Sequence, residues 1–201
     1  LNAGSGGDNL YKKCGQTIPG SPTSGEALFN ESSVDTNDDG IPDETSKACG
    51  DIPYVTHQKT IASITPLGSN KYQINYQIIV RNLGGAASLY DLSDAPSFEN
   101  DIAINSASYT SNVAGNPGTA LAGIGRRNVA DDLNIGAGAV HTYQLIVNVT
   151  IDLNPISNGD NIYKKCGQSG TGVPIAGEGL FNQSRLDTNN DGIADEISEI
   201  C

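Results

Sequence analysis

The 201-residue sequence contains no methionine, no tryptophan and only two histidines, and aromatic residues make up 5% of it. It also lacks a phosphate-binding glycine loop, a zinc-binding HExxH motif and the strand-turn-helix serine motif of hydrolases. The glycine-containing basic segment GIGRRN at 123–128 has no such setting, and we interpret it as a loop. We therefore expect no catalytic residues, and we expect that the protein is not an enzyme.

Basic side chains are scarce as well. Lysine and arginine total 11 against 23 acidic residues, which gives a formal net charge of -12. Such a surface repels phosphate backbones and anionic lipids, so we expect no nucleic-acid partner. No run approaches the roughly 20 apolar residues that a membrane helix needs, so we expect no membrane insertion. Divalent cations are the partners that this charge favours.

What the sequence does contain is a long internal repeat. GDNLYKKCGQ begins at Gly7 and GDNIYKKCGQ at Gly159, and an offset of 152 residues aligns the two copies without a gap. Over the 42 positions that end at Cys49, 26 are identical in the second copy. Residues 7–49 and 159–201 are therefore one module used twice, and we name them module 1 and module 2.

Between the modules, apolar and polar residues alternate as they do in half-buried strands. KYQINYQIIV at 71–80 and AVHTYQLIVNVTIDL at 139–153 show this most clearly. Shorter candidate strands, separated by Gly, Pro, Asn and Asp clusters, lie at 59–64, 87–92, 103–110 and 120–124. About seven short strands without a long amphipathic helix indicate a mainly β fold with a central Ig-like β-sandwich. We expect three units, namely 1–52 with module 1, 53–155 with the sandwich, and 156–201 with module 2.

The middle segment resembles a known family. YQIIVRNLG at 76–84, DLSDAP at 91–96 and LNIGAG at 133–138 are similar to the alternating strand, the Asp-rich stretch and the late glycine turn of DUF11, the Ig-like repeat domain of bacterial surface proteins. The resemblance covers about half of the chain, and it implies a stalk or surface repeat without catalytic residues. The chain departs from the family pattern in the long polar section 111–132, which could carry an extra contact.

The strongest chemical signal is an acidic loop in each module, DTNDDGIPDE at 35–44 and DTNNDGIADE at 187–196. Oxygen-bearing side chains occupy the first, third, fifth and ninth positions, a glycine allows the sharp turn at the sixth, and the seventh can offer its carbonyl. This is the spacing with which a short loop wraps around Ca2+. The predicted ligands are Asp35, Asn37, Asp39, Ile41 and Asp43 in module 1 and Asp187, Asn189, Asp191, Ile193 and Asp195 in module 2.

A complete EF-hand would close this loop with a bidentate glutamate at position twelve, where the chain has Ser46 and Ser198. The loops therefore resemble those of thrombospondin type 3 and dockerin-like proteins, in which an acidic residue from elsewhere completes the coordination. The wide separation of the two loops argues against a true dockerin. The competing interpretation is a pair of solvated Asp/Asn-Gly turns without a metal. Candidate completing donors are Glu44 and Glu196, or Asp8 and Asp160.

The four cysteines follow the repeat, with Cys14 and Cys49 in module 1 and Cys166 and Cys201 in module 2. We predict one disulfide within each module, because so small a module cannot form a large core and needs a covalent link or a bound ion. A zinc site is the rival, but the sequence has no CxxC pair and both histidines lie outside the modules. The aligned Phe-Asn pairs of the two modules are predicted to anchor module packing.

The leading hypothesis is an extracellular, calcium-stabilised structural repeat or filament subunit of a bacterial surface protein, acting as a stalk, an adhesin or a self-assembling fibre. Its expected partners are further copies of itself, as a homopolymer or as tandem repeats, besides a cell-surface or glycan target. The alternative is an accessory carbohydrate-binding module of a secreted multidomain hydrolase. That function needs exposed aromatic rings, and the chain has only 8 tyrosines and 3 phenylalanines.

Overall fold

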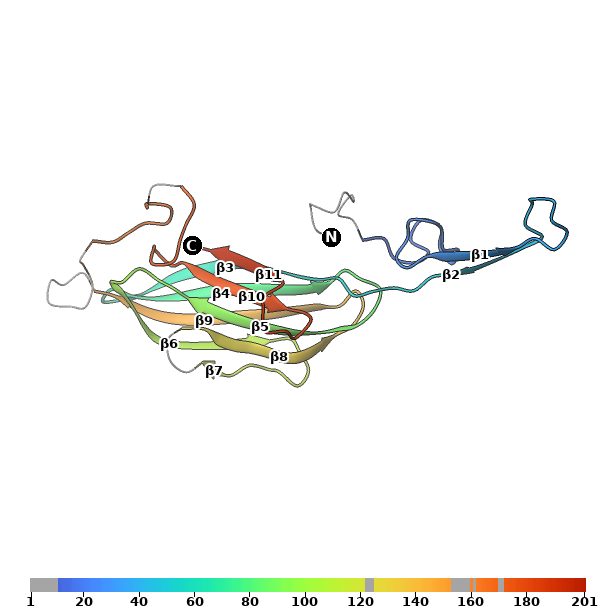
Figure 1. The fold of residues 1–201 in the computed structure, drawn as a ribbon. Helices are drawn as coiled ribbons and strands as arrows, with labels where there is room; N and C mark the ends of the chain where they lie inside the picture. Colours follow the sequence, from blue (N-terminus) through green and yellow to red (C-terminus); the bar gives the residue numbers. More distant parts are fainter. Residues whose placement is uncertain (1–10, 122–124, 153–159, 161, 170–171) are drawn as a thin grey trace. The chain divides into compact units, whose positions relative to one another are not determined.

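The computed structural model describes residues 11–121, 125–152, 160, 162–169 and 172–201. Every regular element in these ranges is a β-strand, and Figure 1 shows the strands along the chain. Over the same residues, no helix has the length and apolar character needed to cross a membrane. The predicted mainly β fold is confirmed.

The chain forms two compact units. Unit 1 comprises Leu1–Val55, Asn82–Ser88 and Gly136–Ala139, and unit 2 comprises Thr56–Arg81, Leu89–Ile135 and Val140–Cys201. Module 2 thus belongs to the same unit as the central strands. The predicted boundary between the sandwich and module 2, at 155–156, lies outside the described residues, so the division into three units stays a prediction.

Unit 1 contains an antiparallel two-stranded sheet formed by β1 (Asn30–Val34) and β2 (Glu44–Ala48). The register places Asn30 opposite Ala48 and Val34 opposite Glu44, and the acidic loop of module 1 connects the two strands. Every residue of both strands is exposed. This hairpin therefore has no buried face within the described part of the chain.

Unit 2 contains a five-stranded sheet in the order β3-β4-β9-β6-β7. Its strands are β3 (Val55–Gly68), β4 (Lys71–Asn82), β6 (Ile102–Ser111), β7 (Ala120–Leu121) and β9 (Val140–Ile151). Strand β4 pairs antiparallel with β9 from Lys71 opposite Thr150 to Arg81 opposite Val140. The predicted alternation holds in both strands, because their apolar residues form the core. The buried residues are Ile74, Tyr76, Ile78 and Val80 on β4 and Tyr143, Leu145, Val147 and Val149 on β9.

A second sheet of unit 2 has four strands in the order β11-β10-β5-β8. They are β5 (Ser88–Pro96), β8 (Arg127–Ile135), β10 (Asn182–Asp187) and β11 (Glu196–Ile200). Its buried side chains meet those of the first sheet, since the hydroxyl of Tyr90 on β5 lies 2.5 Å from the hydroxyl of Tyr143 on β9. The two sheets form the predicted sandwich, and module 2 supplies β10 and β11 to it.

The patterning does not predict β8, and the interpretation of 123–128 as a loop is wrong from Arg127 onward, where β8 begins. The physical reason is an irregularity within the strand. Val129 and Ala130 are both buried although they are neighbours, and Asp132 adopts a positive φ of 48°. The Asp132 amide donates to the carboxylate of Asp91 on β5 at 2.6 Å. A strand with such an irregularity loses the strict alternation by which strands are recognised.

Candidate functional site

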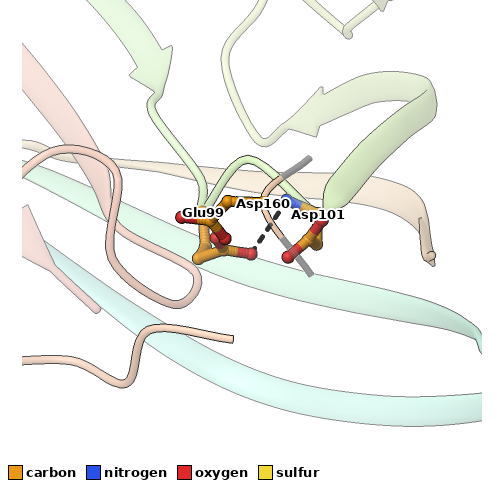
Figure 2. Close-up of side chains that lie close together, drawn as sticks. All are labelled: Glu99, Asp101 and Asp160. Carbon is orange, nitrogen blue, oxygen red and sulfur yellow. Dashed lines mark hydrogen bonds between the residues drawn. The ribbon is translucent and has the colours of Figure 1, made fainter. Parts of the chain in front are cut away.

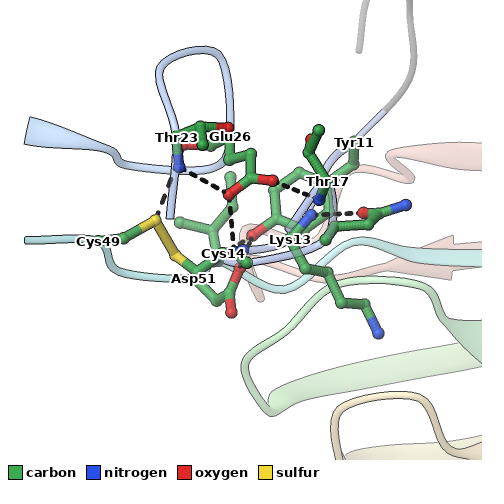
Figure 3. The surroundings of a disulfide bond; sticks show 11 residues. Tyr11, Lys13, Cys14, Thr17, Thr23, Glu26, Cys49 and Asp51 are labelled. Carbon is green, nitrogen blue, oxygen red and sulfur yellow. Dashed lines mark hydrogen bonds between the residues drawn. A yellow bond between two sulfur atoms is a disulfide. The ribbon is translucent and has the colours of Figure 1, made fainter. Parts of the chain in front are cut away.

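Each module is closed by a disulfide. Cys14 bonds to Cys49 in module 1, and Cys166 bonds to Cys201 in module 2, both across 35 residues of sequence. Figure 3 shows the first bond beside Asp51, whose carboxylate accepts hydrogen bonds from the Cys14 amide at 3.0 Å and the Tyr11 hydroxyl at 2.9 Å. Both predicted disulfides are confirmed. Such bonds persist in oxidising compartments, as they do in secreted proteins.

A buried glutamate holds the loop that follows the first cysteine of each module. The Glu26 carboxylate, 1% exposed, accepts from the amides of Gly15 at 2.7 Å, Thr17 at 2.6 Å and Thr23 at 3.1 Å. Hydrogen bonds, with the Thr17 amide contributing most, lower the pKa of Glu26 to about 2. Figure 3 shows this carboxylate between the loop amides.

Glu178 repeats this arrangement in module 2. It accepts from the amides of Gly167 at 2.6 Å and Ser169 at 2.6 Å, and hydrogen bonds led by the Ser169 side chain lower the pKa of Glu178 to about 2. The sequence reasoning missed both glutamates. Their signal was available, because Glu26 and Glu178 occupy the same repeat position and each follows a glycine.

The acidic loops of the two modules fold in the same way, by side chains that accept from amides two to five residues ahead. Asp35 accepts from the amides of Asp38 at 2.8 Å and Gly40 at 2.9 Å, and Asp39 accepts from that of Ile41 at 2.8 Å. Module 2 has the same bonds at 2.7–2.9 Å: Asp187 accepts from the amides of Asn190 and Gly192, and Asp191 accepts from that of Ile193. Burial raises the pKa of Asp35, but the backbone bonds outweigh it and lower that pKa.

The predicted calcium ligands all lie in these loops, but the ninth positions serve the loop itself. Asp43 accepts from the amide and hydroxyl of Thr36 at 2.7 and 2.5 Å, and Asp195 accepts from those of Thr188, both at 2.7 Å. Among the described residues, the loop carboxylates do not gather in threes within 4.8 Å. Calcium binding by the loops therefore remains a prediction.

The predicted completing donors are dispersed. The Glu196 carboxylate accepts a hydrogen bond from the His57 backbone amide of β3 at 3.0 Å. Glu44 is exposed on β2. Asp8 lies outside the described residues. Asp160 joins a different group of carboxylates, to which neither acidic loop contributes.

That group consists of Glu99, Asp101 and Asp160, whose ligand atoms lie within 4.8 Å of one another (Figure 2). Glu99 and Asp101 are 1% and 3% exposed, and Glu99 accepts from the Asp101 amide at 2.9 Å. The second oxygen of Glu99 is buried without a hydrogen-bond partner among the described residues. Three converging carboxylates are the donors that hard cations prefer, so this cluster could hold a metal ion. The sequence reasoning missed Glu99 and Asp101 because they lie far from Asp160 in the chain.

The ammonium of Lys164 also reaches this cluster. It lies 2.7 Å from Asp160 Oδ2, and this hydrogen bond contributes most to lowering the pKa of Asp160. The same bond raises the pKa of Lys164. A cation bound by the three carboxylates would therefore compete with Lys164 for Asp160.

The hairpin of module 2 is built into the sandwich through its backbone. Strand β10 pairs antiparallel with β5, from Asn182 opposite Pro96 to Asp187 opposite Asp91. Beyond β5, the Ser97 amide donates to the Phe181 carbonyl at 2.9 Å, and the Tyr76 hydroxyl donates to the Leu180 carbonyl at 2.9 Å. Phe181 is 5% exposed and Leu186 is fully buried. The predicted anchoring by Phe181 and Asn182 is thus what the structure shows for module 2.

Polar side chains of the hairpin contact four buried residues of the sandwich. We name these residues the hairpin socket; they are His57, Lys59, Tyr76 and Asp94. The side-chain amide of Asn182 donates to the Asp94 carboxylate at 3.2 Å, and the Ser184 hydroxyl lies 3.0 Å from His57 Nε2. Ser198 of β11 accepts from the Lys59 amide at 2.9 Å. Since buried polar groups are costly without partners, these bonds give the docking its specificity.

An ion pair lies at the centre of the socket. The Lys59 ammonium pairs with the Asp94 carboxylate and lies 5.0 Å from the centre of the Tyr76 ring. Both charged side chains are almost completely buried. Burial lowers the pKa of Lys59, and the Asp94 charge opposes that shift. Because an unpaired charge at this depth would be strongly destabilising, both residues depend on each other.

Comparisons with known proteins find no matching family model and no matching curated protein. Two solved structures are similar over most of the chain. BcpA, the major pilin subunit of Bacillus cereus, has a TM-score of 0.32 at 13% identity over 85% of this chain and 47% of its own. A β-glucosidase involved in saponin metabolism from intestinal bacteria has a TM-score of 0.28 at 12% identity over 74% and 16%. The chain therefore spans less than half the length of either protein.

Proposed function

We propose that the chain is an extracellular structural segment of a bacterial surface protein or filament, in which sandwiches follow one another and are joined through copies of the module. One observation carries this proposal: the hairpin of module 2 supplies two strands, β10 and β11, to a sheet of the sandwich. The module is therefore a structural part of the fold, and the same module occurs again ahead of the sandwich. A stalk or filament uses such repetition, whereas catalysis does not require it.

We further propose that calcium stabilises the two acidic loops. In each loop the side-chain oxygens at the first, third and fifth positions accept hydrogen bonds from backbone amides further along the loop, so the loop is already folded around these oxygens. Oxygens at these positions are the ligands of short calcium-binding loops. To coordinate a bound ion, the carboxylate at the ninth position, Asp43 or Asp195, would have to release its hydrogen bonds from Thr36 or Thr188. The cluster of Glu99, Asp101 and Asp160 is the second candidate for the ion.

Carbohydrate binding by aromatic stacking has little support in the described residues. Most of the described aromatic rings of unit 2 serve the core, since Tyr76, Tyr90, Tyr109, Tyr143 and Phe181 are all buried. A glycan-binding face would present such rings to solvent. The proposed role is therefore structural.

The proposed function is tested by locating the protein on the cells that make it. Gold-labelled antibody raised against the 201-residue chain is expected to decorate cell-surface projections or fibres in electron micrographs. Washing the cells with EDTA is expected to soften or shorten these projections, while a wash containing EDTA and excess calcium is not. Label confined to the cytoplasm or to freely soluble material would contradict the proposal.

A further inference from the structure

The two modules have nearly the same sequence but opposite exposure. In module 2, Asn182, Ser184 and Leu186 of β10 are completely buried. The equivalent residues of module 1 are those 152 positions earlier, and all of them lie on the exposed strand β1. Val34, the counterpart of Leu186, is 54% exposed. Module 1 thus presents to solvent a face that module 2 buries.

The positions that face the socket keep their identity between the two modules. Module 1 has the identical residue at the counterparts of Phe181, Asn182, Ser184, Glu196 and Ser198, and it has valine at the counterpart of Leu186. The counterparts of the buried or bonded residues are Phe29, Asn30, Ser32, Val34, Glu44 and Ser46. A face that only met water would have no physical reason to reproduce an asparagine and two serines whose partners in module 2 are the side chains of Asp94 and His57 and the backbone amide of Lys59.

The positions that face away from the socket differ. Gln183 and Arg185 of β10 correspond to Glu31 and Ser33 of β1, and Glu199 of β11 corresponds to Lys47 of β2. Arg185 and Glu199 are exposed in module 2. Apart from Leu186 and Ile200, which correspond to Val34 and Ala48, the two hairpins therefore agree on the inner face, and they diverge on the outer one. This is the pattern of one docking surface used twice.

Strand β1 also has an unused edge. Within the described residues it pairs with β2 alone, whereas β10 pairs with β11 on one side and β5 on the other. An isolated two-stranded hairpin is marginally stable in water, and an open strand edge invites pairing with another strand. The edge of β5 in this chain already carries β10, so a β5 edge open to β1 would have to belong to another sandwich.

We infer that the hairpin of module 1 docks on a second copy of the sandwich, placed ahead of module 1 in a longer chain as this sandwich is placed ahead of module 2. Strand β1 adds to the β5 edge of that copy in the register of β10. Asn30, Ser32 and Ser46 then meet the second copies of Asp94, His57 and Lys59. The folding repeat is accordingly a sandwich followed by its hairpin, and the inference rests on the proposed function of a repeated structural segment.

The test compares backbone hydrogen exchange in two purified proteins. One is the 201-residue chain, and the other is a lengthened chain in which residues 50–158 are repeated directly ahead of residue 7. In the 201-residue chain, the amides of 30–34 are expected to exchange at least about 100-fold faster than those of 182–186. In the lengthened chain, 30–34 are expected to slow to within about tenfold of 182–186.

Two variants of the lengthened chain serve as matched controls. Asn30→Asp places a second carboxylate beside the copied Asp94, and it should restore fast exchange at 30–34 while leaving 182–186 unchanged. Ser33→Asp changes an outward position and should leave both segments slow. These variants keep the acceptor sandwich intact, so a loss of protection cannot come from its failure to fold.

Three outcomes would overturn the inference. The first is fast exchange at 30–34 in both proteins, and the second is equal protection in the Asn30→Asp and Ser33→Asp variants. The third is an increase, with protein concentration, in both the protection of 30–34 and the sedimentation coefficient of the 201-residue chain. The hairpin would then be covered by a separate chain. All three are measured on purified protein, so they are independent of the surface labelling that tests the proposed function.

Discussion

Asn182 on β10 donates its side-chain amide to Asp94 on β5 at 3.2 Å, and both residues are buried. The same carboxylate pairs with Lys59 of β3. One carboxylate thus links the hairpin of module 2 to strands of both sheets. Removing the hairpin would leave a buried ion pair open to water on one side.

This relationship predicts unequal effects of one substitution at equivalent positions of the two modules. Asn182→Asp should lower the free energy of unfolding of the 201-residue chain by about 2–3 kcal/mol, because it replaces a donor with a charge beside Asp94. Asn30→Asp should change it by no more than about 0.5 kcal/mol, because Asn30 is exposed. Urea unfolding followed by circular dichroism measures both. Equal effects at the two positions would contradict the role given to Asp94.

Acid should loosen both modules at the loops held by Glu26 and Glu178. The folded pKa of each is about 2, below the ordinary value of 4.5. A lowered folded pKa means that the stabilisation is fully present above about pH 4.5 and is lost as the pH falls toward 2. The amide signals of Gly15 and Thr17 in nuclear magnetic resonance spectra should report this transition. The Glu26→Gln variant should lose it in module 1 while the Gly167 signal of module 2 still shows it.

Calcium titration can separate the two candidate sites. We expect chelated protein to bind calcium in calorimetry with dissociation constants of about 10⁻⁴ to 10⁻³ M. Asp39→Asn and Asp191→Asn together should abolish the heat if the loops bind, whereas Glu99→Gln should do so if the carboxylate cluster binds. A titration of the unsubstituted chain without heat at millimolar calcium would contradict both sites.

A backbone difference between the modules predicts a stabilising change. Ala27 adopts a φ of 33°, and its counterpart in module 2 is Gly179 with a φ of 42°. Positive φ is costly for alanine and nearly free for glycine, so Ala27→Gly should stabilise module 1 by up to about 1 kcal/mol. The reverse change, Gly179→Ala, should destabilise module 2, because its Cβ would lie 2.7 Å from Cys166 Sγ. Differential scanning calorimetry of the two variants, with their disulfides intact, measures both effects.

The features that the sequence predicted well are those encoded by local pattern or by repetition. The alternation in β4 and β9 marks their buried faces directly, because each apolar side chain falls on the core side. The spacing of the cysteines, reproduced in both modules, predicted both disulfides. Alternation failed at β8, where the neighbours Val129 and Ala130 are both buried and Asp132 adopts a positive φ within the strand.

The hairpin socket could not be predicted in the same way. His57 and Lys59 are polar residues at the start of a strand, and sequence patterning ordinarily assigns such side chains to solvent. The His57 ring is buried with the Ser184 hydroxyl, 127 residues later, as its partner, and the Lys59 ammonium is buried with the Asp94 carboxylate, 35 residues later. The carboxylate cluster has the same character, since Asp160 joins Glu99 and Asp101 only after the chain has folded.

The disulfide of each module also governs how the chain would respond to mechanical tension. Each bond spans 35 residues, a segment that would reach roughly 120 Å if it were pulled straight. While the bond is intact, that length cannot be released, so a pulling force would act on the pairing of β10 with β5. Reduction of the disulfides would turn each module from a short, stiff link into an extensible one.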